Sequence, residues 1–402
     1  MTISPIGAGP TLAIGQSGGA TAAINASLAG VIAAAQASGA FPRILGMRNG
    51  VEGLLGESFL DLTRLDRPTL DGLRVTPSSA LGTGRYKLKD ADLDRALDVL
   101  GAHGITALVY IGGNDSADTA RRLALHAAER KQALQVIAVP KTVDNDLKET
   151  DFCPGYPSMA RALATYVRDA TWDTLAAPKL YPVKFIEVAG RDAGWVAAAG
   201  SLGFSDAELA ADLAPRILLP ERPPASAEAV LDGVQGDLDR RGWAVIVVPE
   251  TLKAGGKPIG GDEPEWVDAF GHAYHASAGE ALSRLAAQRL GVLARVEKPG
   301  SALRMAMALA SPVDLAMAGD LGREAVAALL RGETARMTAL LRTNSTPYAA
   351  ATTTVPVERV ANEVRHFPDD FSADAGAAGY DAFRAWALPL LGDDPFLPYT
   401  RL

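Results

Sequence analysis

Two carboxylates and a lysine stand close together in residues 140–146, which read PKTVDND. A single residue separates Asp144 from Asp146, so one can accept the proton of an attacking hydroxyl while the other binds a metal ion or orients its neighbour. Lys141, beside them, can neutralise phosphate oxygens. Because Asp and Asn are also common in turns, a solvated loop is the alternative interpretation.

Two glycine-rich segments have the composition of phosphate-binding loops. Residues 16–19 read QSGG and precede a helix expected from about Ala22, where backbone N–H groups can approach a phosphate. Residues 112–116 read GGNDS, whose side-chain oxygens can hold a divalent cation and a bridging phosphate. The alternatives are a tight packing turn for the first segment and a helix N-cap at Asp115 or Ser116 for the second.

Three arginines, Arg191, Arg295 and Arg304, follow segments expected to be strands or lie close to them. Arginine binds phosphate in a bidentate manner, so these side chains suit a phosphorylated substrate. A single arginine is more often a surface or ion-pair residue, and the sequence does not show whether the three converge.

Short apolar runs position these segments. The runs cover residues 12–15, 107–111, 136–139, 185–188 and 244–248, and alanine-rich stretches with helical spacing separate them. Such runs predict buried parallel strands covered by helices, as in a doubly wound α/β protein. Ligands of that architecture bind beyond the carboxyl ends of the strands, where the loops described above are expected to lie.

The length and composition set wider limits. The chain has 402 residues, which favours two domains, and a net charge of -8 without a long basic run, which argues against a nucleic-acid partner. One cysteine, Cys153, excludes an intrachain disulfide. The sequence shows neither a secretory signal nor a long apolar span, so we expect a cytoplasmic protein without a membrane partner. Residues 215–225 are expected to form a surface connection, residues 253–264 a mobile loop, and the closing residues a docked segment.

Six segments, QSGGA, IGGNDS, PKTVDND, AGRDAGW, VPE and PGSALR, occur in the order and at the spacings of the phosphofructokinase family. The chain most resembles the bacterial pyrophosphate-dependent branch. The resemblance implies two doubly wound (Rossmann-like) three-layer α/β/α domains with the active site in the cleft between them. We expect residues 1–150 with about 303–350 to bind the phosphoryl donor, and residues 151–302 with about 351–402 to bind the sugar phosphate.

The resemblance also assigns roles near the reacting groups. Asp144 matches the general base that takes the proton of the sugar 1-hydroxyl. Thr142, Val143 and Asp146 match residues at the substrate, and Gly18 matches a backbone contact to the donor. The resemblance implies a Mg²⁺ cofactor.

The expectation that pyrophosphate is the donor depends on the residues near the phosphoryl-donor site. Asn114 occupies the magnesium position, which is Asp in many relatives. ATP-using relatives have glycine in place of Asp115 and a small residue in place of Lys141. A carboxylate at 115 would crowd and repel the α-phosphate of a nucleotide, and Lys141 can stabilise the terminal phosphate of pyrophosphate. Arg85 and Lys87 match basic residues near the donor.

On the acceptor side, the resemblance implies a sugar-phosphate loop at residues 189–191, a carboxylate on the sugar hydroxyls at Glu250, and two arginines on the 6-phosphate, Arg295 and Arg304. Ala189 departs from the usual Met of the loop, and Ser301 stands where His or Tyr is usual. These positions are Ala189, Gly190, Arg191, Glu250, Arg295, Ser301 and Arg304.

The implied reaction is the reversible, Mg²⁺-dependent transfer of a phosphoryl group from pyrophosphate to the 1-hydroxyl of fructose 6-phosphate, in glycolysis or gluconeogenesis. The alternatives are an ATP-dependent enzyme of the same fold, a lipid- or NAD-kinase-like protein, and a non-catalytic sugar-phosphate-binding regulatory subunit. The resemblance further implies a homodimer or higher homo-oligomer, with Arg295 as the candidate that reaches a neighbouring subunit's site.

Overall fold

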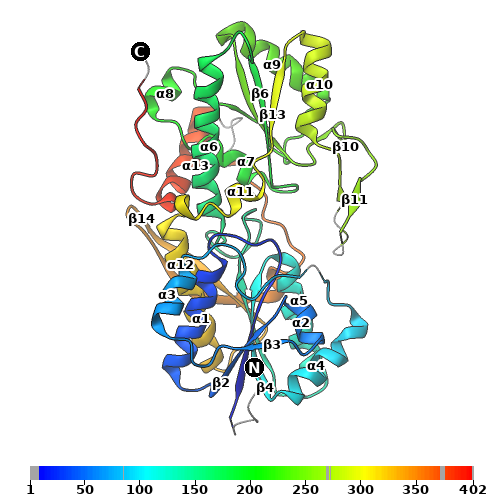
Figure 1. Ribbon diagram of the computed structural model, residues 1–402, viewed down its shortest axis with the longest axis vertical. Helices are drawn as coiled ribbons and strands as arrows, with labels where there is room; N and C mark the ends of the chain where they lie inside the picture. The colour runs from blue at the N-terminus through cyan, green and yellow to red at the C-terminus, as the bar shows by residue number, and fades with distance from the viewer. Residues whose placement is uncertain (1–8, 85, 269–270, 272, 372–375, 401–402) are drawn as a thin grey trace. The chain divides into compact units, whose positions relative to one another are not determined.

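A computed structural model describes residues 9–84, 86–268, 271, 273–371 and 376–400. The chain divides into two compact units, each made of two segments (Figure 1). The first unit comprises Met1–Ser158 and Met305–Val364, and the second comprises Met159–Arg304 and Arg365–Leu402. Among the described residues, no helix combines the length and apolar character needed to cross a membrane.

The first unit is built on a seven-stranded sheet with the order β15-β14-β5-β4-β1-β2-β3. Its central pairings, β2-β1-β4-β5-β14, are parallel, whereas β3 and β15 are antiparallel to their neighbours. The strands are β1 (Thr11–Gln16), β2 (Arg43–Met47), β3 (Phe59–Asp61), β4 (Ile105–Gly112), β5 (Gln135–Pro140), β14 (Arg336–Ser345) and β15 (Tyr348–Pro356).

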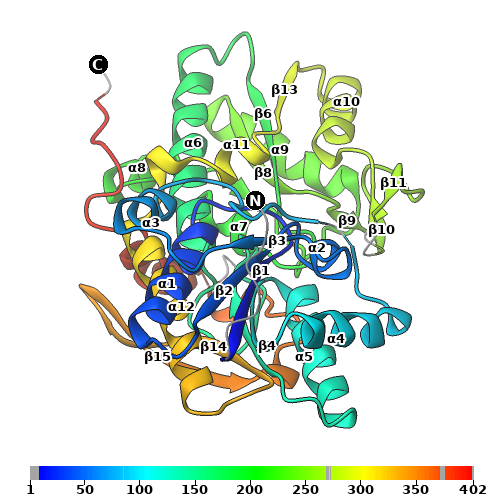
Figure 2. The ribbon, with the colours of Figure 1, turned by 60° about the horizontal axis from the view of Figure 1, so that its bottom comes forward.

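Helices cover both faces of this sheet. In Figures 1 and 2, α1 (Ile24–Ser38), α3 (Arg67–Arg74) and α12 (Pro312–Leu330) lie on one side of the strands, and α2 (Val51–Leu55), α4 (Leu93–Ala102) and α5 (Asn114–Glu129) on the other. Helices α1 and α12 pack backbone against backbone. A Cβ on Gly30 would lie 2.2 Å from the Gly319 carbonyl oxygen, and one on Gly322 would lie 2.3 Å from that of Ser27. Only glycine permits this approach.

The second unit contains a four-stranded parallel sheet with the order β13-β6-β8-β7. Its strands are β6 (Val183–Val188), β7 (Arg216–Ile217), β8 (Ala244–Pro249) and β13 (Ala294–Glu297). Short ribbons pair β9 (Lys253–Ala254) with β10 (Lys257–Pro258), and β11 (Trp266–Val267) with β12 (Ala273–Tyr274). The helices are α6 (Tyr156–Ala176), α7 (Trp195–Ala199), α8 (Asp206–Ala210), α9 (Ala227–Arg241), α10 (Ala278–Leu290), α11 (Ser301–Arg304) and α13 (Gly376–Ala387).

The closing segment of the chain docks on the second unit. Trp195 stacks edge-on against Phe367 at 5.2 Å and lies 5.0 Å from Trp386, so residues after β15 contribute to the hydrophobic core around α7. Beyond α13, Leu390 and Leu391 are buried, and the Tyr399 hydroxyl donates to Asp169. The predicted docking of the closing residues is confirmed for those that the structure describes.

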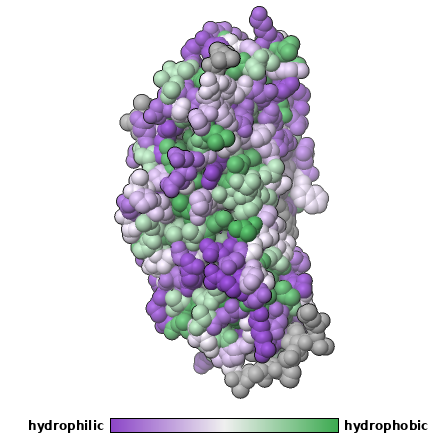
Figure 3. Space-filling model, turned by 60° about the vertical axis from the view of Figure 1, so that its left-hand side comes forward, coloured by the Kyte–Doolittle hydropathy of each residue, from purple (hydrophilic) through white to green (hydrophobic). Residues whose placement is uncertain are grey.

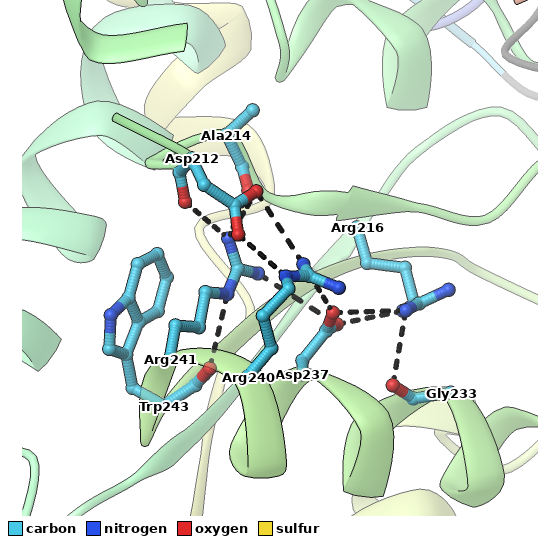
Figure 4. Close-up of polar contacts among 8 residues, drawn as sticks. All are labelled: Asp212, Ala214, Arg216, Gly233, Asp237, Arg240, Arg241 and Trp243. Carbon is cyan, nitrogen blue, oxygen red and sulfur yellow. Dashed lines mark hydrogen bonds and ion pairs between the residues drawn. The ribbon is translucent and has the colours of Figure 1, made fainter. Parts of the chain in front are cut away.

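An arginine–aspartate cluster joins α9 to β7 (Figure 4). Asp237, which is 1% exposed, accepts hydrogen bonds from Arg216 at 2.9 and 3.0 Å and from Arg240 at 3.0 Å. Arg241 stacks on Trp243 at 3.9 Å, and burial lowers its pKa. Because two carboxylates, Asp212 and Asp237, pair with the three arginines, the cluster offsets most of its own charge.

The α/β fold with two parallel-sheet domains is confirmed. The five apolar runs lie within β1, β4, β5, β6 and β8, and the helix expected from about Ala22 begins at Ile24. The predicted domain change at about residue 350 falls inside β15, which pairs with β14 in the first unit, so the chain passes to the second unit only after Val364. Residues 253–264, expected as a mobile loop, include the β9–β10 ribbon. The surface in Figure 3 intermixes hydrophilic and hydrophobic residues.

The α1–α12 contact predicts opposite effects for two helical glycine substitutions. Gly322→Ala should lower the free energy of unfolding by about 1–3 kcal/mol because its Cβ would press on backbone atoms. Gly236→Ala, in α9, meets no atom within 4 Å and should raise the free energy of unfolding by about 0.5–1 kcal/mol. Urea denaturation of both variants measures these changes, and an unaltered midpoint for Gly322→Ala would contradict the packing argument.

Candidate active site

The first unit brings three of the predicted loops to one edge of its sheet. Strands β1, β4 and β5 are parallel neighbours, so the segments that follow them emerge side by side. The Ser17 N–H donates to the Ile111 carbonyl at 2.9 Å, and the Lys141 N–H donates to that of Gly112 at the same distance. The QSGG, GGNDS and PKTVDND segments therefore share this carboxyl edge.

Lys141 places a cation at the glycine-rich turn after β1. Its side chain is 2% exposed, and its Nζ donates to the Gly19 carbonyl at 2.7 Å. Gly18 has a φ of +75°, and a Cβ there would lie 3.3 Å from that Nζ. A backbone that approaches a buried ammonium this closely, next to the start of α1, has the features of an anion site.

The DND segment has a fixed internal geometry. Asn145 is fully buried, adopts a φ of 53°, and accepts a hydrogen bond on its side-chain oxygen from the Cys153 N–H at 2.9 Å. Asn tolerates this left-handed conformation better than most residues. The partly buried Asp144 and Asp146 flank it, and the Asp144 N–H donates to the Thr142 hydroxyl at 3.1 Å. Val143 is buried. Sequence reasoning assigned no separate role to Asn145, although the tolerance of Asn for positive φ was an available signal.

Asn114 makes contacts that do not favour its predicted role as a magnesium ligand. Its side-chain oxygen accepts from the Asn362 N–H at 2.7 Å, and its amide nitrogen donates to the Glu363 carbonyl at 2.6 Å. The amide thus ties the start of α5 to residues 362–363. Asp115 lies in the first turn of α5, and Lys87 Nζ is 3.6 Å from its carboxylate. Arg85 lies outside the described residues.

The acidic residues at this edge fit a magnesium ion that is held largely by substrate. Within the described parts of the chain, no group of three or more His, Cys, Asp or Glu residues is arranged to hold a metal. Magnesium commonly binds one or two carboxylates and completes its octahedron with phosphate oxygens and water. Asp115, Asp144 and Asp146 supply oxygen ligands of that kind.

In the second unit, the AGRDAGW segment follows β6 and is held by a carboxylate and by the closing segment. Gly190 has a φ of +103°, which favours glycine. Glu221 accepts from the N–H groups of Gly194 at 2.9 Å and Phe367 at 2.7 Å. Arg191, after Ala189 and Gly190, lies 5.5 Å from the ring of Tyr274 on β12, within the range of a cation–π contact. Sequence reasoning missed Glu221 and Tyr274.

The other residues assigned to the sugar phosphate lie at opposite ends of the strands of the second sheet. The Glu250 N–H donates to the Val188 carbonyl at 2.7 Å, so Glu250 adjoins the AGRDAGW segment. Ser301 and Arg304 lie in α11, which follows the carboxyl end of β13. Arg295 instead pairs in register with Lys184 near the amino ends of β13 and β6. Within this unit the structure therefore does not bring Arg295 together with Arg191.

Arg295 also has partners of its own at the amino edge. Its guanidinium stacks on Tyr181 at 3.6 Å and approaches Asp173 at 3.5 Å. The buried Lys184 shares Asp173 at 2.7 Å, and this contact lowers the pKa of the Asp173 carboxyl. These contacts hold Arg295 in a defined, partly exposed position.

Comparisons with known proteins agree with this arrangement. Residues 11–329 match the family model described as Phosphofructokinase. The pyrophosphate–fructose 6-phosphate 1-phosphotransferase of Xanthomonas campestris is 37% identical over 391 residues, covering 96% of this chain and 92% of that protein. A sulfofructose kinase of Alkalicoccus urumqiensis is 30% identical over 391 residues, covering 97% of this chain and 98% of that protein.

A solved structure extends the comparison to the fold. The crystal structure of a pyrophosphate-dependent phosphofructokinase from Nitrosospira multiformis superimposes with a TM-score of 0.85 at 32% identity, covering 97% of this chain and 94% of that one. The resemblance indicated by the six ordered motifs is thereby confirmed, and the chain belongs to the phosphofructokinase family.

Proposed function

We propose that this protein transfers a phosphoryl group reversibly from pyrophosphate to the 1-hydroxyl of fructose 6-phosphate, with magnesium as cofactor. The observation that carries the proposal is the carboxyl edge of β1, β4 and β5, where Lys141 contacts the glycine-rich turn after β1, Asp115 lies in the first turn of the helix after β4, and Asp144 follows β5. The names of the Xanthomonas and Nitrosospira proteins support the same donor.

In this reaction Asp144 accepts the proton of the sugar 1-hydroxyl as that oxygen attacks phosphorus. The Thr142 hydroxyl accepts a hydrogen bond from the Asp144 N–H and so helps to fix the direction of the Asp144 carboxylate. Lys141 and the N–H groups around Gly18 offset charge on the transferring phosphoryl group. A bound Mg²⁺ would neutralise phosphate oxygens, with Asp146 as the candidate protein ligand in place of the hydrogen-bonded Asn114 amide.

The proposed donor selectivity is electrostatic. A nucleotide carries an α-phosphate and a nucleoside beyond the two terminal phosphates, and the Asp115 carboxylate would repel that α-phosphate. Pyrophosphate ends before this point and therefore escapes the repulsion. Lys87, 3.6 Å from Asp115, holds the carboxylate in place and adds positive charge near the donor.

On the acceptor side, Arg191 and Arg304 are proposed to bind the 6-phosphate and Glu250 the sugar hydroxyls, with Ala189, Gly190 and Ser301 at the sugar. Arg295 lies at the opposite edge of its sheet, so we propose that it serves the site of a second copy in a homo-oligomer. The exchange of a phosphoanhydride for a phosphate ester makes the reaction reversible, which suits glycolysis and gluconeogenesis.

The direct test is turnover of fructose 6-phosphate with pyrophosphate or ATP as donor, with magnesium and with excess EDTA. We expect magnesium-dependent release of phosphate and formation of fructose 1,6-bisphosphate with pyrophosphate. Asp144→Asn should lower kcat by about 10²–10⁴-fold because the general base is lost. Asp98→Asn, which removes a surface carboxylate bound to Arg130, should keep the wild-type rate. Turnover with ATP and not with pyrophosphate would refute pyrophosphate as the donor. An unchanged kcat for Asp144→Asn would refute Asp144 as the general base.

Replacement of Asp115 by glycine tests the basis of donor selectivity. Asp115→Gly should lower the KM for ATP by about tenfold or more, since a repulsion of more than about 1.4 kcal/mol is removed. Asp94→Gly is a matched control because Asp94 is also an acidic residue in the first turn of a helix, in α4. Steady-state kinetics with both donors measures the change. Equal ATP kinetics in the two variants would show that Asp115 does not exclude nucleotides.

A further inference from the structure

Asp314 is a fully buried carboxylate to which none of the six motifs assigns a role. It lies in the first turn of α12, where Ser311 is the N-cap and accepts the Asp314 N–H at 3.2 Å. An acidic residue in a first turn is favoured by the helix dipole alone. Its side-chain contacts, however, come from a segment of the chain that lies far away in sequence.

Both carboxylate oxygens of Asp314 accept hydrogen bonds from the segment that follows the DND loop. The Gly155 N–H lies 2.9 Å from Oδ1 and 3.1 Å from Oδ2. Oδ2 also accepts from the Ser158 N–H at 3.1 Å and from the Ser158 hydroxyl at 2.6 Å. The Ser311 N–H donates to that hydroxyl at 3.1 Å, so Ser311, Asp314 and Ser158 form a cyclic set of hydrogen bonds. Donors surround the carboxylate, which suits its ionised form.

The anchored segment is paired with the residues that hold Asp144. Gly155 forms a parallel bridge with Thr142, and the Thr142 N–H donates to the Pro154 carbonyl at 3.1 Å. The Thr142 hydroxyl then accepts the Asp144 N–H at 3.1 Å. A continuous set of hydrogen-bonded residues thus leads from α12 to the proposed general base.

Gly155 has little freedom to take another position. Its φ is +104°, and a Cβ there would lie 2.9 Å from Cγ2 of Thr21, in the segment after β1. Thr21 accepts the Ile24 N–H at the start of α1. Gly155 therefore lies against the donor-side loop while it connects Asp314 with Thr142.

Burial of the Asp314 carboxylate in its ionised form costs desolvation free energy. Burial raises the pKa of Asp314 to about 6, although the Ser158 hydroxyl and the Gly155 and Ser158 N–H groups act in the opposite direction. A neutral residue would avoid this desolvation. Asn, the nearest neutral analogue, offers one oxygen acceptor and would turn an NH₂ group toward N–H or O–H donors.

We propose that Asp314 is a positioning residue for Asp144: by anchoring Gly155 and Ser158 to α12, it holds Thr142 and thereby the direction of the general base. The proposal rests on the proposed function, since it assigns Asp144 the proton transfer. A displacement of about 1 Å at a reacting group costs about 10²-fold in rate. Loss of the anchor should therefore lower kcat more than it weakens substrate binding.

The test compares Asp314→Asn with Asp237→Asn. Both remove a buried carboxylate, but Asp237 pairs with Arg216 and Arg240 in the second unit. We expect Asp314→Asn to lower kcat about 10²-fold with both KM values changed less than about threefold. Asp237→Asn should lose thermal stability while kcat stays within about twofold of wild type.

A second measurement does not depend on the reaction. Hydrogen exchange followed by mass spectrometry should show amides of residues 142–155 exchanging at least about tenfold faster in Asp314→Asn and unchanged in Asp237→Asn. Ser158→Ala, which removes the 2.6 Å hydrogen bond, should lower kcat by a smaller factor, and Ser158→Thr, which keeps the hydroxyl, should restore most of it.

The outcomes separate the two claims. If wild-type protein does not turn over fructose 6-phosphate with pyrophosphate, the proposed function fails, and hydrogen exchange alone decides whether Asp314 anchors residues 142–155. Unchanged exchange in Asp314→Asn would overturn the positioning proposal. Faster exchange in Asp314→Asn with an unchanged kcat would also overturn it. The same holds if Asp237→Asn loses as much stability as Asp314→Asn and shows an equal loss of kcat.

Discussion

The parallel pairing of β1, β4 and β5 is the constraint on which the candidate donor site depends. Parallel strands end at the same edge, so three segments separated by up to about 120 residues of sequence emerge together. The paired register of these strands sets the level at which their carboxyl ends lie, and burial on both faces keeps the strands in place. Each loop then needs only local features to complete the site: glycine at 18, a lysine at 141, and carboxylates at 115, 144 and 146.

A buried cation at the glycine-rich turn makes this edge electrostatically distinct within a chain of net charge -8. Burial of a lysine is unfavourable unless hydrogen bonds and anions compensate for lost hydration. The Gly19 carbonyl provides one such bond, and a phosphate bound over the turn would provide further compensation. The same reasoning underlies the proposed role of Asp115 in donor choice, since a partly buried carboxylate is less screened by water than an exposed one.

The sequence predicted the fold through five apolar runs, and the strands that it missed include some whose burial is uneven. Residues 107–111 are uniformly apolar and mark β4, whereas β14 reads RMTALLRTNS and becomes polar and exposed toward its end. The change of domain expected at about residue 350 falls inside β15, which reads YAAATTTVP and has few large apolar residues. Motif order supplied the family and the loop residues. It did not reveal that Asn114 is bound to residues 362–363 or that Arg295 lies at the opposite edge of its sheet from Arg191.

Three residues that sequence reasoning overlooked have one property in common: the side chain of each fixes the backbone of a loop. Asn145 sets the backbone between two aspartates, Glu221 ties the AGRDAGW segment to Phe367, and Asp314 anchors the segment after the DND loop. Two of the three act on partners far along the chain, so no local pattern identifies them. Their common feature is a buried oxygen that accepts backbone N–H groups of a loop. Because a loop has no ladder of its own, such acceptors replace the missing partners and leave one backbone conformation favoured. Precision at the proposed site therefore depends in part on side chains outside the six motifs, such as Glu221 and Asp314.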